Sequence, residues 1–135
     1  MWIKTFYRGL TTFILIFYTI QLQADYGPAD HPVSDAELAT LPPYCHARLK
    51  GEASSKKLWA QRLGERYFQS VRHYCFGLNA MNRANLTLDT LTRKRHFRRA
   101  SNEFSYVLKG WPPSYPLAKQ AQIYKALADA ILNQR

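Results

Sequence analysis

Apolar residues recur at helical spacing through much of this chain, most clearly from position 67 onward. An amphipathic helix carries its apolar side chains at intervals of three and four residues, which places them on one face. One such stripe consists of Tyr67, Val71, Tyr74, Leu78 and Met81. Phe76 lies roughly opposite the stripe, so we expect this helix to pack on two sides and to form the centre of the fold.

Similar patterns predict further helices on both sides of this one, and no segment has the pattern of a strand. Ser34 and Glu37 occupy the S-x-x-E positions of a capping box, which opens a short helix. Gly110 ends a long helix, and Pro116 is acceptable in the first turn of the next. Apart from the short helix, these helices are expected over 44–50, 56–63, 88–108 and 116–133. The predicted fold class is therefore all-α.

The N-terminal segment has the layout of a signal peptide. Lys4 and Arg8 precede an apolar stretch over 10–20, no acid occurs in the first 24 residues, and Ala24 supplies the small residue that a signal peptidase requires. The alternative is an uncleaved anchor helix, but the apolar stretch falls short of the roughly 20 residues that cross a membrane. We expect cleavage after Ala24, a single α-helical domain over 25–135 and a periplasmic or secreted location.

Composition agrees with one folded domain and adds a strong positive charge. The chain has 135 residues, of which 47% are apolar and 14% aromatic, so core material is ample. It has 19 Lys and Arg against 9 Asp and Glu, a formal net charge of +10. This excess of bases predicts an attraction to anionic partners.

Cys45 and Cys75 are the two cysteines, and thiols of exported proteins are oxidised where geometry allows. We expect a disulfide between them that closes a loop of about 30 residues and stabilises the fold by on the order of 3 to 4 kcal/mol. His46 and His73 flank the pair, so a tetrahedral metal site is the alternative. On a helix, however, His73 and Cys75 would point about 200° apart and would not converge on one ion. No metal or other cofactor is expected.

One spacing in the C-terminal half is similar to the second half of a tetratricopeptide repeat. A small residue, an aromatic residue, an apolar residue and a proline follow at intervals of four, three and five, as Ala100, Phe104, Val107 and Pro112. Phe76-Gly77 resembles the large residue and glycine of the first repeat helix, although the 23 positions between Gly77 and Ala100 exceed the repeat by about 11. Over 67–133 the resemblance implies a helical-hairpin scaffold, in a small bundle stapled by the disulfide. The alternative is a plain α-bundle.

Bases are concentrated in the helix expected over 88–108. No acid occurs between Asp89 and Glu103, and on a helix the bases cover an arc of about 140° opposite Phe97 and Phe104. The predicted partner-binding or anion-binding face consists of Lys94, Arg95, Arg98, Arg99 and Lys109. The alternative is a solvated face that only keeps the protein soluble.

These observations predict a binding protein, because no combination of nucleophile, base and orienting group stands out. In a cytosolic protein the basic face would indicate nucleic acid, but the export signal argues against that partner. We expect an exported non-catalytic adaptor that binds another envelope or secreted protein through a helical groove and the basic face. The alternative is a binder of anionic lipid headgroups or acidic polysaccharide.

Overall fold

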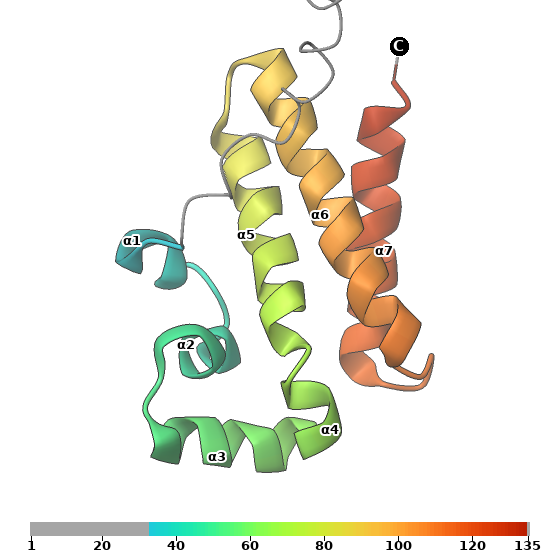
Figure 1. Ribbon diagram of the computed structural model, residues 1–135. Coiled ribbons are helices and arrows are strands. Elements are labelled where there is room, and N and C mark those ends of the chain that lie inside the picture. Colours follow the sequence, from blue (N-terminus) through green and yellow to red (C-terminus); the bar gives the residue numbers. More distant parts are fainter. Residues whose placement is uncertain (1–32, 135) are drawn as a thin grey trace, which may run out of the picture. The chain divides into compact units, whose positions relative to one another are not determined.

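The computed structural model describes residues 33–134, so the expected signal peptide lies outside the described residues. Every regular element in this part of the chain is a helix, which confirms the all-α prediction. The helices are α1 (Asp35–Leu38), α2 (Pro43–Lys50), α3 (Ala53–Leu63), α4 (Glu65–Phe68), α5 (Val71–Leu86), α6 (Thr90–Gly110) and α7 (Pro116–Leu132). In Figure 1 the three long helices α5, α6 and α7 run side by side, and α3 crosses near the start of α5. None of the described helices has both the length and the apolar character that a membrane span requires.

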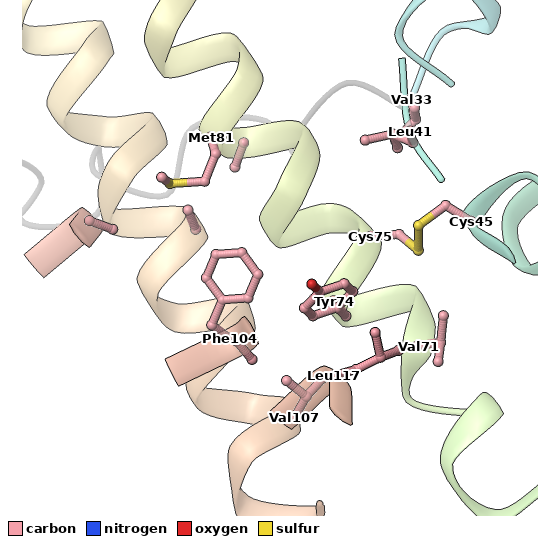
Figure 2. Close-up of a cluster of buried hydrophobic side chains, with 14 of the residues drawn as sticks. Val33, Leu41, Cys45, Val71, Tyr74, Cys75, Met81, Phe104, Val107 and Leu117 are labelled. Atoms are coloured by element: carbon pink, nitrogen blue, oxygen red, sulfur yellow. A yellow bond between two sulfur atoms is a disulfide. The ribbon is translucent and has the colours of Figure 1, made fainter. Parts of the chain in front are cut away.

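α5 and α6 form a helical hairpin whose core is aromatic. Tyr74 and Phe104 are fully buried, with their ring centroids 5.7 Å apart (Figure 2). Gly77 lets the Phe104 ring pack closely against the backbone of α5, because a Cβ atom added at position 77 would lie 2.7 Å from the nearest carbon of that ring. α7 covers α6, and the hydroxyl of the buried Ser101 donates to Asp129 across that contact, at 2.6 Å. The tetratricopeptide resemblance itself stays a prediction.

The helix expected from Tyr67 onward is two helices, which corrects the sequence interpretation. Tyr67 belongs to α4, and a turn at Gln69 and Ser70 separates it from α5. The Ser70 hydroxyl donates to the Tyr67 carbonyl and accepts from the Trp111 indole at 2.8 Å. Arg48 donates to the carbonyls of residues 68 and 69. These contacts stabilise the turn by satisfying groups that a continuous helix would have paired within itself.

The ends of the remaining helices follow local signals. Asp89 caps α6 by accepting from the backbone N–H of Thr92 at 2.7 Å, so α6 starts two residues later than predicted. α3 starts at Ala53, three residues earlier than predicted. It ends at Gly64, whose φ of 88° is a conformation that glycine adopts without strain.

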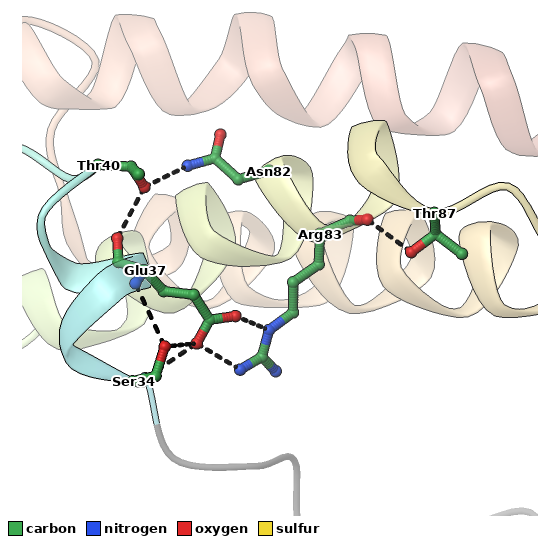
Figure 3. A network of polar contacts seen from close by, with 6 residues as sticks. All are labelled: Ser34, Glu37, Thr40, Asn82, Arg83 and Thr87. Atoms are coloured by element: carbon green, nitrogen blue, oxygen red, sulfur yellow. Dashed lines mark hydrogen bonds and ion pairs between the residues drawn. The ribbon is translucent and has the colours of Figure 1, made fainter.

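Two attachments hold the N-terminal helices against α5. The predicted disulfide joins Cys45 of α2 to Cys75 of α5, and both residues are fully buried. α1 has the predicted capping box, in which Ser34 and Glu37 bond to each other's backbone N–H groups. Glu37 also forms a bidentate ion pair with Arg83 of α5, with Nε–Oε1 2.5 Å and Nη2–Oε2 3.0 Å (Figure 3). The arginine holds the pKa of the Glu37 carboxyl at about 2, well below its usual range.

Candidate anion-binding site

A pocket of about 210 Å³ lies where α4 turns into α5. Most of its lining side chains are cationic or polar, and none is acidic. The lining consists of Arg48, Arg66, Gln69, Ser70, Arg72, His73 and Tyr106. We call this site the arginine pocket. Its residues come from α2, α4, α5 and α6 and from the turn before α5.

The disulfide explains how two of the arginines meet. Arg48 follows Cys45 by three residues on α2, and Arg72 precedes Cys75 by three residues on α5. Residues three apart on a helix lie on the same face, so each arginine lies one turn from the covalent link between its helix and the other. The two positive charges are close enough for Arg72 to contribute to lowering the pKa of the half-buried Arg48, after the larger effect of burial.

Backbone carbonyls hold Arg48 in place. Its Nε donates to the carbonyl of Phe68 at 3.2 Å, and its Nη2 donates to the carbonyl of Gln69 at 3.3 Å. Carbonyl oxygens carry no net charge, so they hold the guanidinium in place without supplying a counter-ion for its positive charge. Arg48 is therefore a preorganised cation at the wall of the pocket.

A chain of polar contacts orients a second group of lining residues. His73 Nδ1 contacts Glu103 Oε2 at 2.8 Å, and Arg72 Nε donates to His73 Nε2 at 3.3 Å. These partners suit an imidazole that donates from Nδ1 and accepts at Nε2. The Tyr106 ring lies against the imidazole, with centroids 3.9 Å apart. Arg72, His73 and Tyr106 therefore support one another from two helices.

The lining of the pocket concentrates positive charge. Among the described residues, no carboxylate forms an ion pair with Arg48, Arg66 or Arg72. α5 begins at Val71, beside the pocket, and the N-terminal end of a helix carries partial positive charge. Guanidinium groups bind carboxylates and phosphates through paired hydrogen bonds. The arrangement can therefore hold an anionic group.

The structure separates the predicted basic face into two parts. Arg95, Arg98 and Lys109 are exposed, Lys94 is half-exposed, and none of the four pairs with a carboxylate among the described residues. Arg99 differs: its guanidinium lies 5.9 Å from the centroid of the Phe76 ring and 3.8 Å from the Glu103 carboxylate. Burial lowers the pKa of Arg99.

Lys109 connects the exposed part of this face with the arginine pocket. It follows Tyr106 by three residues on α6, and residues at that spacing are neighbours on a helix surface. The exposed basic surface of α6 therefore adjoins the pocket at its C-terminal end.

The arginines of the pocket were missed because they are scattered through the sequence. Arg48, Arg66 and Arg72 belong to three helices and form no run of bases. One signal was present in the sequence. Arg48 follows Cys45 by three residues and Arg72 precedes Cys75 by three, so each arginine lies one helical turn from a cysteine of the disulfide. Arg66 has no comparable signal, because its position depends on the turn between α4 and α5.

Within residues 33–134, no group of three or more histidine, cysteine or acidic side chains has an arrangement that could hold a metal ion. Both cysteine sulfurs are bonded to each other, as the disulfide prediction required. Comparisons with protein-family models, with curated proteins and with solved structures find no match to this chain.

Proposed function

We propose that this protein is an exported, non-catalytic adaptor that binds an acidic segment of another envelope or secreted protein. The arginine pocket receives a carboxylate of that segment, and the exposed bases of α6 attract the rest of it. The single observation that carries the proposal is the set of three arginines around one pocket with no carboxylate partner among the described residues.

The shape of the pocket favours an acidic side chain of a protein as its ligand, rather than a flat charged surface such as a membrane. The pocket is concave, and its volume of about 210 Å³ suits one or two acidic side chains. Arg48 is held by carbonyls before any ligand arrives, so binding does not require ordering it. Tyr106, which is 53% exposed, offers an aromatic contact beside the charges, as binding interfaces between proteins commonly do.

The proposed location rests on two observations of different kinds. The sequence has the layout of a signal peptide, and the structure has a disulfide. Disulfides persist in oxidising compartments and are rare in the cytosol. Periplasmic or secreted proteins are therefore the partners to test.

The test compares two sets of charge reversals. Arg66→Glu with Arg72→Glu changes two exposed residues of the pocket, and Lys57→Glu with Lys56→Glu makes the same charge change on the exposed surface of α3. Fluorescence anisotropy with a labelled glutamate-rich peptide measures binding at matched ionic strength. We expect the pocket variant to bind about tenfold more weakly, since hydrogen bonds to charged groups contribute about 1.5 to 3 kcal/mol. We expect a loss of about twofold or less for the α3 variant, because that surface contributes only screened, long-range attraction.

The same variants identify the natural partner class. Immobilised protein is incubated with periplasmic or secreted extract, and retained proteins are compared between the pocket variant and the α3 variant. A partner lost only with the pocket variant would support the proposal. Equal binding by the two variants would remove the pocket from the function. Stronger pocket-dependent binding to an acidic polysaccharide or to anionic vesicles than to the peptide would favour the alternative function.

A further inference from the structure

The turn between α5 and α6 exposes three leucines at one end of the hairpin. Leu86 ends α5, Leu88 lies in the turn, and Leu91 lies in the first turn of α6. They are 83%, 99% and 61% exposed, respectively. Single exposed apolar residues are common, but three within six positions concentrate exposed apolar surface at the tip of the hairpin. We call these three residues the leucine tip.

The first part of α6, which follows the leucine tip, is rich in bases. Four positive side chains follow within ten residues of Leu88, and Asp89 is the one acid over 86–98. The bases are Arg93, Lys94, Arg95 and Arg98, and none pairs with a carboxylate among the described residues. The Asp89 carboxylate is used to cap α6. Exposed apolar side chains at the tip are therefore followed by a positively charged stretch of α6.

We propose that the leucine tip docks on the surface of an anionic phospholipid bilayer. Apolar side chains enter the boundary between headgroups and acyl chains, and nearby Lys and Arg side chains bind the anionic headgroups. A bilayer fits this surface because it adapts to a convex projection. A protein partner would need a matching concavity. The charge of the four bases complements the charge of anionic lipids.

The position of the leucine tip determines how a docked protein would be oriented on the bilayer. Arg72 and Leu86 stand 14 residues apart on α5, which corresponds to about 21 Å at 1.5 Å per residue. The leucine tip and the arginine pocket thus occupy opposite ends of the same helix. A protein docked by its tip would present the pocket away from the lipid, where it remains accessible to a partner.

The experiment uses the protein as it is recovered after export, with its N-terminus determined by mass spectrometry. Cosedimentation is measured with vesicles of phosphatidylcholine alone and of phosphatidylcholine with phosphatidylglycerol. We expect binding to the mixed vesicles, and a loss of at least about tenfold when Leu86, Leu88 and Leu91 are all replaced by serine, from the apolar area removed. Replacing Lys94 and Arg95 by glutamine should weaken binding by about fivefold per charge.

A matched control makes the same kind of change on α7. Ile123 and Leu127 are 66% and 49% exposed, and the nearby Lys125 is paired with Asp129. Replacing both apolar residues by serine should leave vesicle binding unchanged. All variants share the same N-terminus, so any contribution from that segment is common to them, and circular dichroism verifies that each is folded.

Four results would overturn the proposal. The first is no binding of the wild-type protein to mixed vesicles, and the second is equal binding by the leucine-tip variant and the wild type. The third is an equal loss in the α7 variant. Self-association that depends on the leucine tip, without vesicle binding, would identify a second copy as its occupant and would also overturn it. Peptide binding at the arginine pocket should be unchanged in the leucine-tip variant, so the two proposals fail separately.

Discussion

Replacing Gly77 by alanine tests how closely α5 and α6 are packed. The added Cβ would lie 2.7, 2.9 and 3.0 Å from three carbons of the Phe104 ring. Carbon atoms pack best at roughly 3.5 to 4.0 Å, so the ring would have to move by about half an ångström or more. Phe104 is fully buried, with Tyr74 and Tyr124 each 5.7 Å from its centroid, so it has little room to move.

The size of the effect follows from two opposing contributions. Overpacking of a well-filled core costs about 1 to 3 kcal/mol. Alanine in place of glycine inside a helix returns up to about 1 kcal/mol. We therefore expect Gly77→Ala to lower the free energy of unfolding by about 1 to 2 kcal/mol, measured by urea denaturation with the disulfide intact.

Gly110 and Phe104 provide the controls. No atom lies within 4 Å of a Cβ added at Gly110, the last residue of α6, so Gly110→Ala should stabilise the protein by about 0.5 kcal/mol. In a Phe104→Leu background, which removes the opposing ring carbons, Gly77→Ala should be neutral or stabilising. If Gly77→Ala stabilises the wild-type protein as Gly110→Ala does, the reasoning about close packing is refuted.

Two attachments of the N-terminal helices give further predictions. The disulfide between Cys45 and Cys75, with a sequence separation of 30, should contribute about 3.6 kcal/mol, which urea denaturation of the oxidised protein and of a Cys→Ala double variant would measure. Intact-mass analysis after alkylation should show no free thiol in the oxidised protein. The pKa of Glu37 is lowered from 4.5 to about 2 by Arg83, so this ion pair stabilises the fold above about pH 5 and is progressively lost as the pH falls toward 2. Because Glu37 is 28% exposed, we expect a loss of about 1 to 2 kcal/mol, and Glu37→Gln should remove this part of the pH dependence.

Helix ends that depend on neighbouring residues could be predicted from the sequence. The capping box of Ser34 and Glu37 opens α1, and Pro116 begins α7, as expected. In each case the deciding group lies within one turn of the helix end, so a local pattern contains the relevant physics. The disulfide was also predictable, because the chain has two cysteines and an N-terminal segment with the layout of a signal peptide.

The break between α4 and α5 could not be predicted in the same way. No glycine or proline marks it. The turn at Ser70 is stabilised by Arg48, which precedes it by 22 residues, and by Trp111, which follows it by 41. An uninterrupted apolar stripe therefore predicted one helix where tertiary contacts support two.

The candidate site could be predicted only in part from the sequence, for the same reason. A run of bases in α6 was visible, but helical geometry alone did not show that Arg99 packs on Phe76 and pairs with Glu103. An arc of about 140° includes positions at its edge, and those positions can face a neighbouring helix. The arginine pocket required the mutual placement of several helices, which a one-dimensional pattern does not contain.

The position of α3 between the two cysteines has a consequence for the integrity of the chain. No side chain of α3 is fully buried, so this helix opens to solvent more readily than α5 or α6 do. Proteases cut segments that open locally. Cys45 precedes α3 and Cys75 follows it, so a single cut within α3 leaves one cysteine in each fragment. The nicked chain would remain one covalent molecule, with the long helices and both of its candidate binding surfaces still joined.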